Sequence, residues 1–139
     1  MRERLRVAAE TLMAQDQSYT ALSVERIVRE AGISRATFYV YFEDKGDLLR
    51  ALAEDFIERI LVAASIWWQL PPGATKTDLR TAMQTVFDAY LPHKVVMAAV
   101  VEVASYDADL RTLFGSLLDR TIGEVARHIA DGQEQGFVA

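Results

Sequence analysis

The chain has 139 residues, of which 51% are hydrophobic and 25% are charged, so it is long enough to bury a core and polar enough to fold as a globular protein. It contains no cysteine, which excludes disulfide bonds, thiolate metal sites and cysteine nucleophiles, and which is typical of a cytoplasmic protein. The net charge of −5 excludes a broad basic surface, but residues 1–50 balance eight basic against eight acidic side chains, which permits DNA binding through a few placed contacts.

Apolar residues recur at helical spacing along the chain, and no stretch shows the two-residue alternation of a half-buried strand. This pattern predicts an all-α protein. The first predicted helix covers residues 3–14 and ends in the polar turn Asp16-Gln17-Ser18.

Capping residues delimit the next two predicted helices. Ser23 is a suitable N-cap for the second helix, and Gly32 supplies the residue that can adopt a left-handed conformation after its last turn. Ser34 then caps a short third helix over residues 35–41. A helix of about eight residues, a glycine turn and a second short helix have the spacing of a helix-turn-helix.

Four further helices complete the predicted fold. Asp44 caps a long helix that ends before Pro71-Pro72-Gly73, because proline disfavours helix in the residue before it. The next-to-last helix is apolar all round, which predicts a central helix covered on several sides. The four predicted ranges are 45–70, 77–91, 94–105 and a last helix that opens at Asp107 or Asp109.

Residues 20–56 closely resemble the DNA-binding signature of tetracycline-repressor (TetR) family regulators. The similarity keeps one register over some 35 residues, whereas a glycine turn alone would be weak evidence. The matching residues are Ser23-Val24, Ile27-Val28, Ala31-Gly32-Ile33-Ser34, Thr37-Phe38-Tyr39, Tyr41-Phe42, Lys45 and the apolar Leu48-Leu49-Leu52 face.

The third predicted helix is too short to bury all of its side chains. Phe38 and Phe42 fall on its inner face, so the other side chains must point outward. Arginine can pair with guanine, threonine with a thymine methyl or a phosphate, and tyrosine with the DNA backbone. The outward residues are Arg35, Thr37, Tyr39, Val40 and Tyr41.

The resemblance implies where this chain would contact DNA. Base contacts are expected at the start of the third helix, and phosphate contacts from Ser23, Tyr41 and Lys45, assisted by two helix N-termini. The full predicted set is Ser23, Arg26, Ser34, Arg35, Ala36, Thr37, Tyr39, Tyr41 and Lys45.

Some of these positions allow another interpretation. Glu25 departs from the family pattern, which often has a basic or polar DNA contact there, so Arg26 or Arg29 would have to supply the charge. Tyr39 and Tyr41 can instead be half-buried packing residues. Lys45 can be an ordinary solvated lysine beside acidic neighbours.

The resemblance further implies two domains, a three-helix helix-turn-helix domain at 1–45 and a helical effector-binding bundle at 46–139. In the family the bundle holds a small effector and two further C-terminal helices build a homodimer; those helices are expected to be absent here, which makes the regulatory domain C-terminally truncated. The pocket residues would suit an apolar or aromatic effector. They are Phe56, Ile60, Trp67, Phe87, Tyr90, Met97, Val101, Tyr106, Phe114 and Leu118, each of which can equally be core.

The predicted function is that of a ligand-responsive transcriptional regulator, a repressor released from a palindromic double-stranded operator. Two alternatives remain: a helix-turn-helix protein that serves only as a protein interaction module, and a helical enzyme using Glu102, Asp107, His93 or His128. No nucleophile-base pairing, phosphate loop or metal-ligand spacing supports an enzyme. We therefore expect no cofactor, no metal and, since no apolar run approaches about 20 residues, no membrane span.

Overall fold

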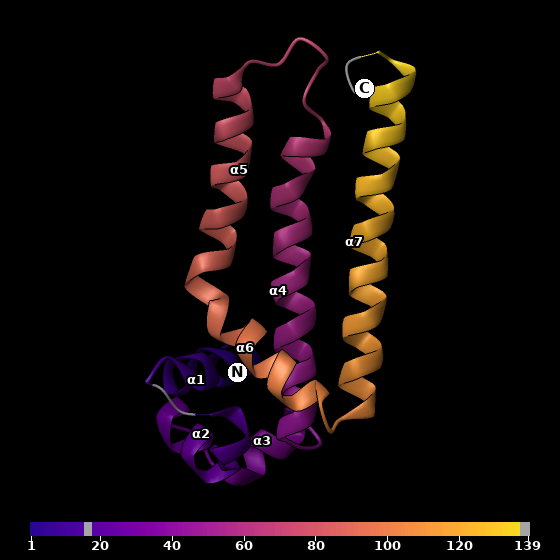
Figure 1. The fold of residues 1–139 in the computed structure, drawn as a ribbon. Helices are drawn as coiled ribbons and strands as arrows, with labels where there is room; N and C mark the ends of the chain where they lie inside the picture. The colour runs from indigo at the N-terminus through magenta and orange to yellow at the C-terminus, as the bar shows by residue number, and fades with distance from the viewer. Residues whose placement is uncertain (16–17, 137–139) are drawn as a thin grey trace. The chain divides into compact units, whose positions relative to one another are not determined.

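The computed structural model of the protein describes residues 1–15 and 18–136. All of its regular elements are helical, and no strand occurs in those residues, which confirms the predicted all-α class. The elements, in chain order, are α1 (Arg2–Ala14), η1 (Tyr19–Ala21), α2 (Val24–Ala31), α3 (Arg35–Tyr41), α4 (Lys45–Trp68), α5 (Lys76–Tyr90), η2 (Leu91–His93), α6 (Lys94–Ala104) and α7 (Ala108–Glu134) (Figure 1).

The chain divides into two compact units, each built from two stretches of sequence. Unit 1 comprises Met1–Asp55 and His93–Phe114, and unit 2 comprises Phe56–Pro92 and the chain from Gly115 onward. Helices α4 and α7 each contribute residues to both units. The predicted division between residues 45 and 46 concerns function rather than compactness, so it stays a prediction.

Unit 1 contains a tightly packed core. Helix α1 packs against α2 and α6, α2 packs against α3, and α6 also contacts η1. The largest fully buried side chains come from α1, α2, α3 and α6, from the residue after η1 and from the first turns of α4 and α7, so the small helices are fixed by a shared core rather than by their own length. These side chains are Leu5, Leu12, Leu22, Ile27, Phe38, Leu48, Leu49, Val96, Val100 and Leu110.

The predicted caps of unit 1 are confirmed. The side-chain oxygens of Ser23, Ser34 and Asp44 each accept a hydrogen bond from the backbone N–H three residues further on, at 3.1, 3.1 and 2.8 Å. Gly32 has φ 68°, the left-handed conformation expected at the end of α2. In the predicted turn Asp16-Gln17-Ser18, the first two residues lie outside the described part of the chain.

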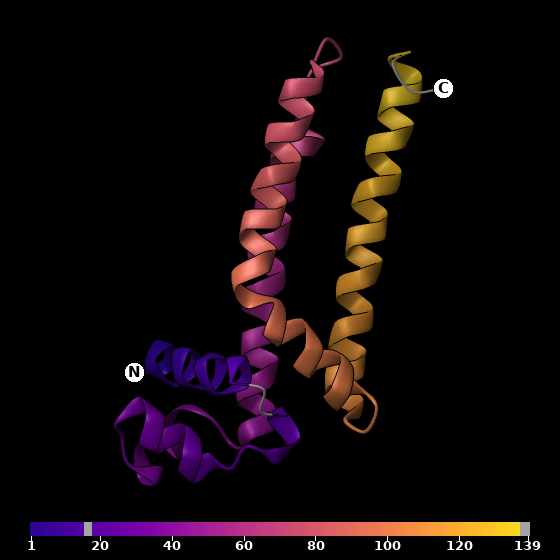
Figure 2. The ribbon, with the colours of Figure 1, turned by 60° about the vertical axis from the view of Figure 1, so that its left-hand side comes forward.

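Unit 2 combines the second part of α4 with α5 and the second part of α7, and α5 returns antiparallel to α4 after the proline-containing loop (Figures 1 and 2). The rings of Phe56 and Tyr90 meet at 5.9 Å between α4 and α5. At the far end of α4, the rings of Trp67 and Trp68 lie 5.7 and 5.5 Å from the ring of His128 on α7. Aromatic contacts therefore link the three helices of this unit.

The prediction that residues 94–105 form a helix covered on several sides is met only in part. Helix α6 buries one face, with Val96 and Val100 at its centre, and leaves Val101 59% exposed. An apolar sequence allows a helix to be buried on every side, but the neighbouring elements determine how much of its surface is covered. In unit 1 the neighbours of α6 are α1 and η1.

Candidate nucleic-acid interface

Helix α3 presents a polar and aromatic face outward because two phenylalanines hold its other side. Phe38 is fully buried and Phe42 is 2% exposed, and their rings lie 5.8 Å apart. Tyr39, Val40 and Tyr41 are 46%, 76% and 38% exposed. The outward orientation expected from the helical period is therefore present. At 46% and 38% exposure Tyr39 and Tyr41 still bury more than half of their surface, so the alternative that they are packing residues remains open.

The remaining predicted contact residues lie at the N-termini of α2 and α3. Ser23, Arg26, Ser34, Arg35 and Ala36 are exposed. The hydroxyl of Thr37 is less accessible, because it lies 2.8 Å from that of Ser34 in a hydrogen bond. The structure thus brings the start of α2 and the whole of α3 to one surface, while the DNA contacts themselves stay a prediction.

Glu25 is also part of this surface, where it contacts a residue of α3 that the local sequence does not indicate as its partner. One of its carboxylate oxygens lies 3.5 Å from the guanidinium of Arg35, although both side chains are more than 60% exposed. The guanidinium also lies 5.7 Å from the ring centre of Tyr39. A hydrogen bond with Tyr39, aided by the charge of Glu25, raises the pKa of Arg35. Helix α2 therefore contributes a carboxylate that is paired with the arginine of α3.

Lys45 is half-buried and is bound to the backbone of its own unit. Its ammonium donates hydrogen bonds to the carbonyls of Tyr19, Thr20 and Leu22, at 3.2, 2.8 and 2.6 Å. In return the hydroxyl of Tyr19 donates to the carbonyl of Lys45, and burial lowers the pKa of the lysine. An ordinary solvated lysine does not describe this arrangement, because the fold brings residue 45 onto a turn more than 20 residues away. The predicted phosphate contact of Lys45 stays a prediction.

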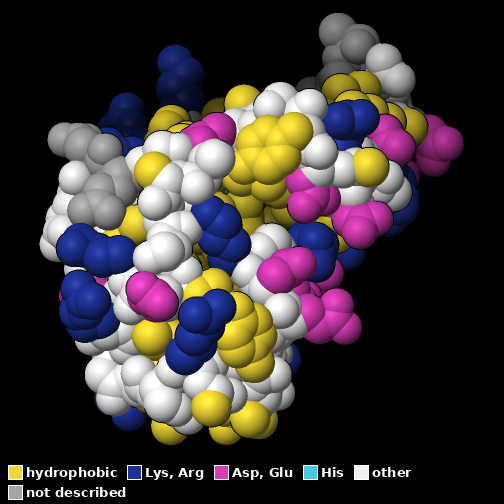
Figure 3. All heavy atoms as spheres, turned by 90° about the horizontal axis from the view of Figure 1, so that it is seen from below, with side chains coloured by type: hydrophobic (Ala, Val, Ile, Leu, Met, Phe, Trp, Pro, Cys, Tyr) yellow, Lys and Arg dark blue, Asp and Glu magenta, His cyan; other side chains and the backbone are white. Residues whose placement is uncertain are grey.

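Charge is distributed thinly over the face of the molecule shown in Figure 3. Lys and Arg side chains there are separated by hydrophobic and neutral groups, and Asp and Glu side chains lie among them. This agrees with the balanced charge of residues 1–50. Any nucleic-acid contact must therefore depend on individual side chains rather than on a continuous basic surface.

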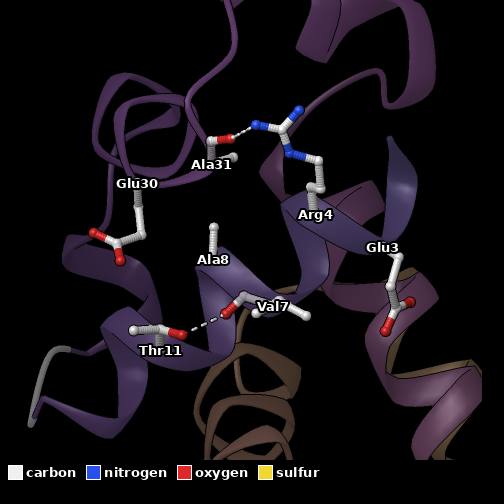
Figure 4. A pocket seen from close by; sticks show the side chains of 7 residues that line it. All are labelled: Glu3, Arg4, Val7, Ala8, Thr11, Glu30 and Ala31. Carbon is white, nitrogen blue, oxygen red and sulfur yellow. Dashed lines mark hydrogen bonds between the residues drawn. The ribbon is translucent and has the colours of Figure 1, made fainter.

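A groove of about 410 Å³ separates α1 from the end of α2 (Figure 4). Arg4 extends across it and donates to the carbonyl of Ala31 at 2.7 Å, which satisfies one of the terminal carbonyls of α2 next to Gly32. None of the predicted contact residues lines it. The lining residues are Glu3, Arg4, Val7, Ala8, Thr11, Glu30 and Ala31.

The predicted effector residues are divided between the two units. Met97, Val101, Tyr106 and Phe114 belong to unit 1, and the six others belong to unit 2. A hollow of about 290 Å³ in unit 2, between Trp67, the proline loop, Leu79 and His128, has Trp67 alone in common with the predicted set. Phe87, Val101 and Tyr106 are more than half exposed. The effector pocket stays a prediction.

Polar contacts attach α6 to the helix-turn-helix elements, and no sequence pattern indicates them. Glu102 accepts a hydrogen bond from Ser18, which lowers the pKa of the carboxyl group. The hydroxyls of Tyr106 and Thr20 lie 2.5 Å apart. His93 Nδ1 lies 2.6 Å from the carboxylate of Glu10 on α1.

The residues of the enzyme alternative are thus engaged in structural contacts. Asp107 caps α7 at 2.8 Å and pairs with Arg50 at 3.6 Å, besides the contacts of Glu102 and His93. Among residues 1–15 and 18–136, no three His, Cys, Asp or Glu side chains group as metal ligands would. No helix in the same residues has the length and apolar character needed to cross a membrane.

Comparisons with known proteins point in one direction. Residues 5–52 match the family model of bacterial regulatory proteins of the tetR family. The regulator EthR of Mycolicibacterium smegmatis is 24% identical over 135 residues, which are 97% of this chain and 62% of that protein. EthR of Mycobacterium tuberculosis is 26% identical over 92% of this chain and 59% of its own length. The chain therefore spans about three fifths of the length of these curated relatives.

Solved structures share the fold. A putative TetR-family transcriptional regulator from Syntrophomonas wolfei superposes with a TM-score of 0.72 at 21% identity, over 97% of this chain and 69% of that structure. A putative regulator of the same family from Vibrio parahaemolyticus gives 0.69 at 24% identity, over 97% and 71%.

Proposed function

Because the chain belongs to the TetR family of bacterial regulatory proteins, we propose that it binds double-stranded operator DNA and regulates transcription. The observation that carries the proposal is the outward face of α3, where Arg35 is exposed and Tyr39 and Tyr41 are partly exposed beside the buried Phe38. These side chains are suited to the major groove and to the DNA backbone.

A palindromic operator follows from the size of the reading surface. Helix α3 has seven residues and reaches only a few base pairs, so useful affinity requires two copies on successive major grooves about 34 Å apart. The proposed active species is therefore a homodimer, acting in the cytoplasm, where bacterial DNA lies.

Control by a small apolar or aromatic effector completes the proposal. Helix α4 begins beside the reading surface and contributes residues to both units, so a shift of this helix would change the spacing of two recognition helices. The aromatic group around Trp67 and the hollow beside it support an apolar ligand. Operator complexes that dissociate no faster with any compound that demonstrably binds would contradict this step.

The direct test selects DNA fragments from a random pool with the full chain and measures binding of the selected sequence at increasing salt concentration. We expect a palindrome whose affinity falls steeply with salt, and much weaker binding, still measurable at low salt, for Arg35→Ala and Tyr39→Ala. Val62→Ala, a change of an exposed residue in unit 2, is the control and should bind like the original chain.

The second candidate function is a protein interaction module without operator binding. Glu25 on the reading surface and the net charge of −5 favour it. It predicts that no sequence is enriched from the random pool at any salt concentration.

A further inference from the structure

We propose that Glu25 and Arg35 act as one specificity-determining pair, in which Glu25 holds Arg35 for reading guanine and keeps it from binding phosphate at random sequences. The proposal rests on the proposed DNA-binding function and adds a residue that the family pattern does not provide. Glu25 is in this view a positioning residue, and Arg35 is the residue that touches the base.

The pair joins two helices of the helix-turn-helix although both side chains are exposed. Glu25 and Arg35 come from different helices, the side chains are 68% and 62% exposed, and they still approach to 3.5 Å. Packing does not force this contact, since neither side chain is enclosed. The ring of Tyr39, 5.7 Å from the guanidinium, supports Arg35 from the second side. Together the two partners restrict an arginine that would otherwise sample many rotamers.

Restriction of Arg35 has a direct consequence for base reading. A guanidinium pairs with O6 and N7 of guanine through two parallel hydrogen bonds, which requires a fixed plane, whereas a phosphate accepts it from many directions. An arginine held in advance loses less rotamer freedom when it meets guanine. Pre-organisation therefore favours the specific contact over the non-specific one.

The charge of Glu25 acts in the same direction. A carboxylate at the DNA surface repels phosphates, and pairing with Arg35 cancels the positive charge that non-specific binding would use. The O6 and N7 atoms of guanine can compete with the carboxylate for the guanidinium of Arg35, because together they accept two parallel hydrogen bonds. The glutamate at position 25, which departs from the family pattern, would thus weaken binding to DNA that lacks the operator sequence.

The test compares the original chain with Glu25→Gln and with the matched control Glu30→Gln, which removes the same charge from another exposed position of α2. Each is used in DNA selection and in binding titrations against its operator and against random DNA. Substituting the exposed glutamates leaves the core intact, and a single cooperative thermal transition in each variant verifies this.

We expect the original chain to prefer guanine at one position of each half-site by about 5- to 150-fold. Glu25→Gln should weaken this preference by about 2- to 5-fold, as loss of an exposed ion pair would. Glu25→Gln should also tighten binding to random DNA. The slope of log affinity against log salt concentration should become steeper by about 0.9 for each Arg35 that is freed to contact a phosphate. Glu30→Gln should leave guanine preference unchanged.

A double-mutant cycle separates the pair from two independent residues. In the Arg35→Ala background, Glu25→Gln should no longer alter base preference, because there is no arginine left to position. The pair proposal is wrong if Glu25→Gln and Glu30→Gln have the same guanine preference and the same ratio of operator affinity to random-DNA affinity. Operator binding itself would still stand in that case. If the original chain selects no sequence, both proposals are wrong.

Discussion

The ammonium of Lys45 lies 2.6 Å from the carbonyl oxygen of Leu22, the residue before the N-cap of α2. The same ammonium also binds the carbonyls of Tyr19 and Thr20. The first residue of α4 is thereby attached to the segment that leads into the helix-turn-helix. This contact gives Lys45 a structural role within unit 1.

Lys45→Met should lower the free energy of unfolding by about 1–3 kcal/mol, because three carbonyls lose their donor. Chemical denaturation measures this effect, with Lys76→Met on the exposed start of α5 as the control. Operator affinity should fall while the slope of affinity against salt stays the same. A slope reduced by about 0.9 per subunit would instead show that Lys45 contacts phosphate.

Gly32→Ala should destabilise the protein by about 1–2 kcal/mol, because a side chain at φ 68° is strained. The added Cβ would also lie 3.3 Å from the guanidinium of Arg4, which binds the end of α2. Gly123→Ala is the matched substitution inside α7, where a Cβ meets no atom within 4 Å. It should raise the free energy of unfolding by about 0.5–1 kcal/mol. Equal signs for the two changes would contradict the helix ending at Gly32.

Ser34→Ala should cost about 1 kcal/mol of stability, since the hydroxyl caps α3 through the backbone N–H of Thr37 at 3.1 Å. Ser34→Gly should cost only a few tenths, because glycine is itself tolerated at an N-cap. Thermal unfolding of the two variants gives the comparison. The cap has no such role if Ser34→Gly is as damaging as Ser34→Ala.

Glu102→Gln should weaken the attachment of α6 to Ser18 by about 1 kcal/mol at neutral pH, a value already reduced for the partial exposure of the carboxylate. The hydrogen bond from Ser18 holds the pKa of Glu102 below its ordinary value of 4.5. Its contribution is therefore complete above pH 4.5 and is lost as the pH falls through the lowered pKa.

The stability difference between the original chain and Glu102→Gln should accordingly shrink in acid. Denaturation curves at several pH values measure it, with Glu54→Gln on the exposed side of α4 as the control. A difference that grows below pH 4.5 would have the wrong sign for this contact.

Much of unit 1 could be predicted from local sequence. The caps at Ser23 and Ser34, the turn at Gly32 and the inward Phe38 depend on nearest neighbours along the chain and on the helical period, so one sequence is enough to find them. The exposure of Tyr39 follows from the same period. These features place α3 and expose its outer face.

Contacts between distant segments could not be predicted in this way. Helical spacing says nothing about which helix meets α6, so it gave no sign that Glu102 would bind Ser18 or that Val101 would stay exposed. The predicted effector residues follow the same period and include both buried Phe56 and exposed Phe87. A stripe of apolar residues does not distinguish a packed face from an open one.

The sequence alone determined that the protein is all-α and which side of α3 faces outward, because both depend on periodicity and on caps within a few residues. Only the tertiary structure decided the partners of Glu25 and Lys45. The carboxylate of Glu25 pairs with a guanidinium of another helix, and the ammonium of Lys45 binds carbonyls of another segment. The packing of the helices sets both distances. Packing brings the carboxylate of α2 to Arg35 and attaches Lys45 to the turn before α2, and no local pattern encodes either meeting.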